Sequence, residues 1–233
     1  MTYKIAILGD FNPFYSTHHA LNDSIRHARN VFKTDIQFDW ISTETHNINN
    51  ALKNIYSGLW IAPGSPYKNM ENVLSAIKFA RENNIPSFGN CGGFQHMIIE
   101  FARNVCGIKN ADHEETNPDS ADLLISKLSC SLVEKEEELK ILDKNSILFD
   151  IINKEEFLGR YFCSYGINGK YTDTLKSNGL KLTAISSDGH VRAFELKSHP
   201  FFVGTLFQPA LTSSFDEPNP LIVEFIKQST KQS

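Results

Sequence analysis

One stretch of the chain combines a reactive side chain with small residues that expose it: Phe88-Gly89-Asn90-Cys91-Gly92-Gly93-Phe94-Gln95. Residues 85–88 have the apolar character of a strand end, and apolar residues recur at helical spacing after the glycines. We therefore expect Cys91 on a sharp turn between strand and helix, where the helix N-terminus favours the thiolate. The alternative is a buried structural cysteine beside a tight turn.

The composition of the 233 residues is that of an ordinary globular protein, with 41% hydrophobic and 21% charged residues. This length supports one sizeable core, so we expect a single domain over residues 1–233. A net charge of −4 argues against a nucleic-acid surface. Residues 1–10 indicate a first strand rather than a signal peptide, and we expect no membrane segment. The charge run 134–140 suggests a solvated loop or edge.

The four cysteines are too few for a disulfide framework and lack the spacing of metal ligands. They are Cys91, Cys106, Cys130 and Cys163. We therefore expect a reducing, cytoplasmic environment, without a metal ion or another cofactor.

Strand and helix patterns alternate in the first half of the chain. Apolar runs at 5–8, 36–41 and 59–62 predict strands, and the stripe over 70–82 predicts a helix. This order favours an α/β fold with a mostly parallel central sheet, flanked by helices, and a site at the carboxyl ends of its strands. In the second half we expect antiparallel strands added to the same sheet, at 123–133, 157–167, 182–186, 191–196 and 201–207. A helix at 219–228 should close the chain.

With Cys91 expected on a sharp turn between strand and helix, called the elbow below, the sequence resembles the class I glutamine amidotransferase family. Within that family it resembles the glutaminase domain of CTP synthase. The best-matching segments lie at 62–64, 80–86, 89–95, 99–105 and 199–204. The resemblance covers nearly the whole chain and implies the class I glutamine amidotransferase fold. The synthase half has no counterpart here, which is typical of stand-alone proteins related to the C-terminal region of CTP synthase.

The resemblance implies roles for several residues around the elbow. Cys91 matches the nucleophile, and the backbone amides of Gly92 and of the Gly64-Ser65 loop match the donors of an oxyanion hole. Glu115 matches the carboxylate that holds the α-amino group of the substrate.

Two departures from the family pattern affect its chemistry. Residues 207–210 read Phe-Gln-Pro-Ala where the family has Phe-His-Pro-Glu, so Gln208 and Ala210 replace the triad histidine and glutamate. Glutamine cannot take a proton at neutral pH, and we do not expect glutamine hydrolysis by the family mechanism. Ser164 stands where the family has the arginine that binds the α-carboxylate. A cysteine is partly thiolate at pH 7, so other chemistry can survive.

Other polar residues could serve the site instead. His18 and His19 follow the first strand, and His113 shares a loop with Glu115, although surface or capping roles are the alternative for each. Cys163 could resolve an oxidised intermediate, relay an acyl group or fill space. The catalytic candidates are Cys91, His113 and Gln208, and the substrate-binding candidates are Gln95, Glu115, Cys163, Ser164, Tyr165, His18 and His19.

The leading hypothesis is a thiol-dependent hydrolase or transferase acting on a small amine-bearing substrate other than free glutamine. The alternative is a catalytically silent module that binds a metabolite or regulates a partner, and a third hypothesis is a redox role for Cys91 with Cys163. Ammonia from an isolated glutaminase would escape to solvent. A true amidotransferase would therefore need a separate synthase partner, and a homo-oligomer is the other assembly considered.

Overall fold

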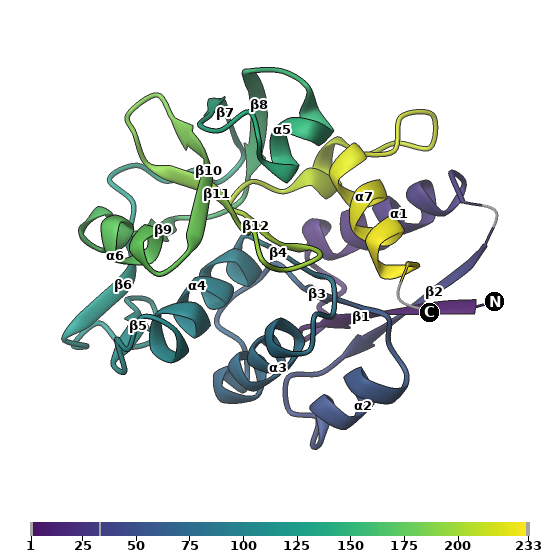
Figure 1. Ribbon diagram of the computed structural model, residues 1–233, viewed down its shortest axis with the longest axis horizontal. Coiled ribbons are helices and arrows are strands. Elements are labelled where there is room, and N and C mark those ends of the chain that lie inside the picture. Colours follow the sequence, from purple (N-terminus) through teal and green to yellow (C-terminus); the bar gives the residue numbers. More distant parts are fainter. Residues whose placement is uncertain (1, 33, 232–233) are drawn as a thin grey trace.

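A nine-stranded sheet runs through the middle of the computed structural model, which describes residues 2–32 and 34–231 (Figure 1). The strand order is β2-β1-β3-β4-β12-β11-β10-β7-β8. Neighbours pair in parallel among β1 (Thr2–Leu8), β2 (Asp35–Ile41), β3 (Gly58–Ile61), β4 (Ser87–Asn90) and β12 (Phe202–Thr205). Antiparallel pairing adds β11 (Val191–Leu196), β10 (Leu180–Ser186), β7 (Lys135–Ile141) and β8 (Glu156–Tyr161). The predicted α/β fold is confirmed, as a large mixed sheet flanked by helices.

Helices cover both faces of this sheet (Figure 1). Phe88 of β4 packs on Phe225 of α7, whereas the neighbouring Gly89 faces Met97 of α4. Because successive strand residues point to opposite faces, α7 and α4 lie on opposite sides. The helices are α1 (Ser16–Arg29), α2 (Ile48–Asn54), α3 (Met70–Glu82), α4 (Gly92–Asn104), α5 (Ile147–Ile152), α6 (Thr172–Ser177) and α7 (Pro220–Ser229), with 3-10 turns at Gly169–Tyr171 and Pro209–Thr212.

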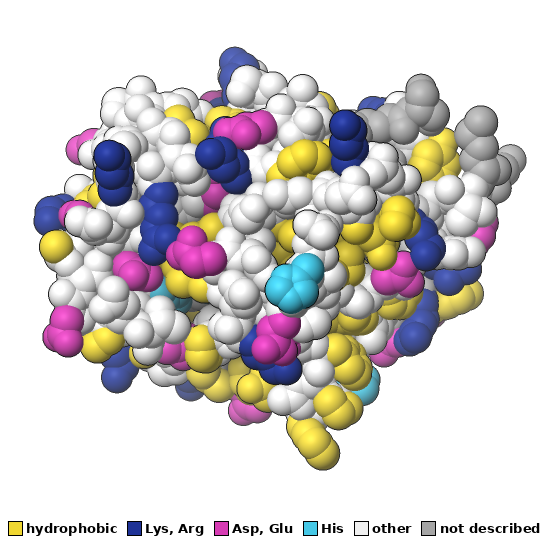
Figure 2. Space-filling model, turned by 90° about the horizontal axis from the view of Figure 1, so that it is seen from below, with side chains coloured by type: hydrophobic (Ala, Val, Ile, Leu, Met, Phe, Trp, Pro, Cys, Tyr) yellow, Lys and Arg dark blue, Asp and Glu magenta, His cyan; other side chains and the backbone are white. Residues whose placement is uncertain are grey.

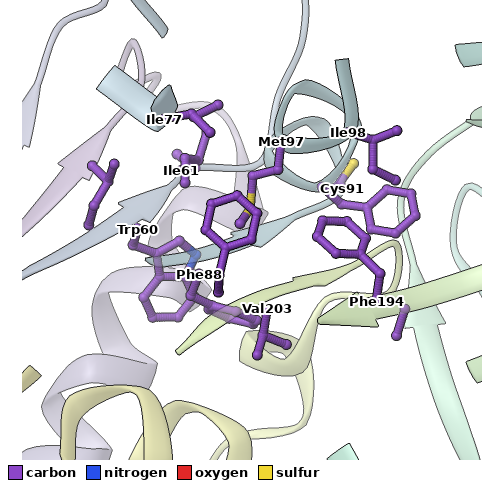
Figure 3. Close-up of a cluster of buried hydrophobic side chains, with 14 of the residues drawn as sticks. Trp60, Ile61, Ile77, Phe88, Cys91, Met97, Ile98, Phe194 and Val203 are labelled. Carbon is purple, nitrogen blue, oxygen red and sulfur yellow. The ribbon is translucent and has the colours of Figure 1, made fainter. Parts of the chain in front are cut away.

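A row of large side chains crosses the central strands on the α7 side. Strand register places Trp60, Phe88 and Val203 next to one another on β3, β4 and β12. Figure 3 shows this row and, around α4, the side chains of Met97 and Ile98. All five side chains are buried, so the central strands are covered on both faces and their apolar runs are continuous.

The other face of β3 and β4 holds α4 unusually close. A Cβ on Gly93 would lie 2.2 Å from the Ile61 carbonyl oxygen, and one on Gly89 would lie 2.5 Å from Met97 Sδ. These two positions therefore tolerate only glycine without a shift of the backbone or of Met97. The contact fixes the start of α4, and with it Cys91, against the carboxyl ends of the strands.

The second half differs from the sequence prediction in its division into sheets. A separate three-stranded sheet forms from β5 (Ala111–His113), β6 (Asp122–Lys127) and β9 (Tyr165–Ile167), so these strands are not additions to the main sheet. The strand expected over 157–167 is divided, with β8 in the main sheet and β9 in the small one. Residues 162–164 connect them, and their backbone accepts hydrogen bonds from Leu132 and Leu128 instead of from a strand partner.

The charge run 134–140 forms most of β7 and lies between β10 and β8, so the expectation of a solvated loop or an edge is wrong. Leu139 and Ile141 are buried on one face of this strand. Glu137 binds Arg192 through contacts of 2.8 and 3.3 Å. The charges therefore belong to a strand with one apolar face.

None of the helices in the described residues is long and apolar enough to cross a bilayer. On the face seen in Figure 2, Lys and Arg side chains are interspersed with Asp and Glu and form no continuous basic field. This distribution offers no electrostatic track for a phosphate backbone on that face.

A buried ion pair joins α3 to α4. The Arg81 guanidinium donates to both carboxylate oxygens of Glu100, from Nε at 2.9 Å and from Nη2 at 2.7 Å. Glu100 is fully buried, and its carboxylate holds the pKa of Arg81 above its usual value. Losing the arginine would leave an unpaired charge in the interior.

We predict that Arg81→Met lowers the free energy of unfolding by about 3–5 kcal/mol, because it strands the Glu100 carboxylate. Urea denaturation measures the change. Arg26→Met is the matched control, since Arg26 pairs with Asp23 on the surface and should cost less than about 1 kcal/mol. Similar losses in the two variants would contradict the role of the buried pair.

Candidate active site

The chain turns sharply at Cys91, between β4 and α4. Its φ of 52° and ψ of −112° lie outside the regions that side chains ordinarily favour. The Cys91 N–H donates to the Thr205 carbonyl at 3.0 Å, and the Cys91 carbonyl accepts from the Gln95 N–H at 3.2 Å. Strand pairing on one side and the first helical bond on the other therefore hold the backbone in this conformation.

A pocket of about 360 Å³ opens over this turn, at the carboxyl ends of β3, β4 and β12. The sequence candidates that line it are Gly64, Ser65, Cys91, Gln95, Glu115, Cys163, Ser164, Tyr165 and Gln208. Four other candidates, Gly92, His18, His19 and His113, do not line it. Sequence reasoning missed its apolar mouth, where Phe14, Tyr15, Val133 and Phe162 are exposed. The only signal for Phe14 and Tyr15 was their position in a loop after the first strand.

Two backbone amides face the Cys91 sulfur. The backbone N–H groups of Gly92 and Gly64 both lower the pKa of the Cys91 thiol. A Cβ on Gly92 would lie 3.2 Å from the Gly64 carbonyl carbon, so the two backbones are in close contact. Gly64 itself has a φ of 100°, which glycine adopts without strain. The pair forms a small set of donors that can hold negative charge at this place.

Cys163 supplies a second thiol to the same place. Its S–H donates to the Tyr165 carbonyl at 3.6 Å, and the Cys163 side chain beside Cys91 lowers the pKa of the Cys91 thiol despite the opposing effect of burial. The amides of Gly92 and Gly64 act in the same direction. The Cys91 side chain and burial raise the pKa of Cys163 well above its usual value. Of the two thiols, Cys91 therefore loses its proton more readily and Cys163 less readily.

His18 and His19 lie near the loops of the site without reaching its interior. The His18 Nδ1 accepts from the Asn12 N–H at 3.0 Å, so its Nε2–H donates to the Pro63 carbonyl at 2.9 Å. Burial lowers the pKa of His18 and favours this neutral form. His19 is exposed and contacts the Pro13 carbonyl. The structure thus places His18 as a support for the loop that carries Gly64.

His113 lies behind the wall of the pocket. Its Nδ1 accepts from the Glu115 N–H at 3.1 Å, and its Nε2 donates to the Gln95 side-chain oxygen at 3.1 Å. The Gln95 amide nitrogen in turn donates to the Tyr165 carbonyl at 2.9 Å. Burial lowers the pKa of His113 to about 3, so the imidazole is neutral at physiological pH. Both ring nitrogens are occupied in positioning other residues.

Gln208 lines the pocket. The side-chain oxygen of Gln208 accepts a long hydrogen bond, 3.4 Å, from Asn90 Nδ2. The backbone N–H of Gln208 donates to the Arg160 carbonyl at 2.8 Å. A carboxamide offers hydrogen bonds and no proton exchange. Ala210, two residues on, is buried and presents only a methyl group.

Glu115 is the one carboxylate among the lining residues described by the structure, and no Lys, Arg or His side chain stands among them. Its Oε2 accepts from Ser65 Oγ at 2.8 Å, which joins the two loops at the rim. Among residues 2–32 and 34–231, no three His, Cys, Asp or Glu side chains are grouped so that they could hold a metal ion. The charge of the lined surface is therefore suited to a cation.

Comparison with known proteins gives concordant results. The family model for glutamine amidotransferase class-I matches residues 14–228. CTP synthase of Cytophaga hutchinsonii is 32% identical over 96% of this chain, and CTP synthase of Saccharolobus solfataricus is 32% identical over 97%. The chain spans 44% of the length of each of these relatives.

Solved structures agree with the sequence relatives. The glutaminase domain of Trypanosoma brucei CTPS, solved with bound acivicin, has a TM-score of 0.90 and 25% identity, covering 99% of this chain and 95% of that one. A glutamine amidotransferase from Thermotoga maritima, at 9% identity and a TM-score of 0.59, covers 99% of this chain and 97% of that one and shares the fold. The protein is therefore a member of the class-I glutamine amidotransferase family, related to CTP synthase.

Proposed function

We propose that this protein uses Cys91 as a nucleophile on a small amine-bearing substrate other than free glutamine, in a hydrolase or transferase reaction. The observation that carries the proposal is the composition of the pocket. It combines an activated thiol and Glu115 with no side chain that could pair with the α-carboxylate of glutamine. A cationic amine without a neighbouring carboxylate matches this charge.

The thiol pair can carry out the proton transfers that a histidine performs elsewhere. The Cys91 thiolate attacks the substrate carbonyl carbon, and the resulting oxyanion accepts hydrogen bonds from the amides of Gly92 and Gly64. The carbon–nitrogen bond then breaks, and the leaving amine takes the Cys163 proton. Water or a second amine next attacks the thioester carbon and gives its proton to the Cys163 thiolate, which regenerates the starting pair.

The remaining residues of the wall shape the site. Gln95 fixes the Tyr165 carbonyl, and His113 fixes Gln95, so these three form a rigid side of the pocket. Ser164 bonds to Ser131 through its hydroxyl at 2.9 Å. In this proposal Gln208 orients or contacts the substrate through its carboxamide and takes no part in proton transfer.

The mouth of the pocket suits an apolar group on the substrate. Phe14 is 92% exposed, and Tyr15 and Phe162 are also exposed there. Aromatic side chains in such positions favour ligands that cover them. The proposed substrate class is therefore an amide that bears an ammonium group and an apolar side chain.

A second candidate is a silent binding module, which is favoured by Gln208 and Ala210 at the two positions of the missing triad residues. Replacement of Cys91 by Ser distinguishes the candidates, since a binding module would keep its ligand affinity and its biological effect. A separate synthase partner is part of both proposals, the enzyme and the binding module. The curated relatives carry a further region beyond the part that matches this chain, and an amidotransferase needs an acceptor site for its ammonia.

We predict that ammonia release from glutamine stays within about tenfold of the Cys91→Ala background, because loss of triad residues costs several orders of magnitude in rate. A coupled ammonia assay measures this. Rapid release that disappears in Cys91→Ala would contradict the exclusion of glutamine.

Phenylalanine amide should protect Cys91 from iodoacetamide better than phenylalanine does, because only the acid carries a carboxylate that the pocket leaves unpaired. Glu115→Gln should weaken this protection by roughly tenfold or more, since a hydrogen-bonded charge pair contributes about 1.5–3 kcal/mol. Asp119→Asn, in the same loop and outside the pocket, serves as the control. Equal protection by acid and amide would refute the charge argument.

Alkylation of Cys91 should remain fast as the pH falls below the usual range of thiols, because its pKa is lowered and the thiolate persists there. Cys163→Ala should move the pH profile upward and slow alkylation at pH 7 by roughly tenfold, since a hydrogen bond to the anion is lost. Cys106→Ala is the control, because burial alone raises the pKa of Cys106. An unchanged profile in Cys163→Ala would rule out activation by the thiol contact.

A further inference from the structure

Two free thiols that line one pocket have a chemistry of their own. Cys91 and Cys163 each keep 7% of their surface exposed, and both line the pocket. Both are free in this structure, and the Cys91 sulfur lies 3.7 Å from the carbonyl oxygen of Phe162, the residue that precedes Cys163. The other two cysteines, Cys106 and Cys130, lie outside this pocket.

The contacts around the two sulfurs leave the pair free to approach. The Cys91 sulfur lies 3.7 Å from the Phe162 carbonyl oxygen, and the Cys163 sulfur lies 3.6 Å from the Tyr165 carbonyl oxygen. Both are weak sulfur contacts, whereas a disulfide brings the sulfurs to about 2.05 Å. A change in the side-chain torsion of Cys163 would break only one such bond.

The backbone around the two cysteines differs. Cys91 is fixed at the elbow by the strand and helix bonds on either side. Cys163 lies on the short connection 162–164 between β8 and β9, which belong to different sheets. The second thiol can therefore adjust to the first without disrupting a ladder of strand bonds.

The pocket also gives a small oxidant access to Cys91. Its volume of about 360 Å³ is many times the space of a water-sized molecule, roughly 30 Å³ in the liquid. The amides of Gly92 and Gly64 converge on the sulfur and can stabilise the oxygen anion that leaves during attack on a peroxide.

We propose that Cys91 and Cys163 form a reversible intramolecular disulfide, with a hydroperoxide as the oxidant. The Cys91 sulfur attacks one peroxide oxygen, the O–O bond breaks, and Cys91 becomes a sulfenic acid while the other oxygen leaves as hydroxide. This hydroxide takes the Cys163 proton and becomes water. The Cys163 thiolate then attacks the Cys91 sulfur and expels a second hydroxide, which is protonated by solvent.

Overall, the two thiols lose two electrons as they form the disulfide, and one hydrogen peroxide is reduced to two waters. An external dithiol reverses the change by thiol–disulfide exchange. In the oxidised state Cys91 has no thiolate, so any reaction that depends on this nucleophile stops. The inference needs only the thiol pair and the pocket, and it holds whether or not the protein hydrolyses an amide.

The test is titration of the intact, reduced protein with hydrogen peroxide, followed by thiol counting and peptide mapping by mass spectrometry. One equivalent of peroxide should remove two of the four thiols, with a loss of two hydrogens in mass and a single Cys91–Cys163 linkage. Alkylation of Cys91 should fall more than tenfold and return after dithiothreitol. The double variant Cys106→Ser/Cys130→Ser should behave as the wild type does.

Variants separate the two roles. Cys163→Ser should stop at a Cys91 sulfenic acid that dimedone traps, whereas Cys91→Ser should consume peroxide at least tenfold more slowly. Wild-type protein that yields Cys91 sulfinic acid beside a free Cys163, or a linkage between two chains, would overturn the proposal. Peptide mapping of the wild type decides this even if a variant fails to fold. Failure here would leave protection by phenylalanine amide unaffected, so the two proposals can be told apart.

Discussion

The close approach of α4 to the ends of β3 and β4 is the constraint from which the site follows. Gly89 and Gly93 remove the side chains that would hold the helix away, and Ile61 and Met97 occupy the space between. The chain can turn from strand to helix in one residue only because this contact is available. Cys91 accepts an unfavourable backbone conformation as a result, and its side chain stands at the edge of the sheet instead of inside it. The Arg81–Glu100 pair reinforces the same helix from its outer side.

The donors around the sulfur depend on that placement. Gly92 begins α4, and Gly64 lies in the loop that follows β3, so their close approach depends on the contact between helix and strand. His18 donates to the Pro63 carbonyl in the same loop, and burial favours its neutral form by lowering its pKa. These features stabilise negative charge at one point without any cationic side chain. An anionic sulfur or oxygen can therefore be held here while the pocket as a whole stays suited to a cation.

Sequence patterns predicted the parts of this arrangement that depend on local order. The stripe over 70–82 matched α3 because its apolar residues repeat at helical spacing and Asn69 caps its first turn. The short helices α2, α5 and α6 were not predicted, since six or seven residues give less than two turns of periodicity. The strand β7 was missed because its charges hid the alternation of Leu139 and Ile141. Glu115 and Gln208, which the family resemblance singled out, both line the pocket.

The approach of Cys163 to Cys91 shows why the remaining features of the site could not be predicted from the sequence. The two residues are far apart in sequence, and their meeting depends on where the chain leaves the main sheet after β8 to join the small sheet at β9. No periodic pattern in the sequence marks the residue at which the chain leaves the main sheet. In the proposed mechanism, Cys163 carries the proton that neither Gln208 nor Ala210 can carry. A thiol in that place differs from an imidazole in one property that matters: it can form a covalent bond with the nucleophile it serves. Proton transfer and oxidation are therefore alternatives for the same pair of sulfurs, and the state of the pair decides which reactions Cys91 can enter.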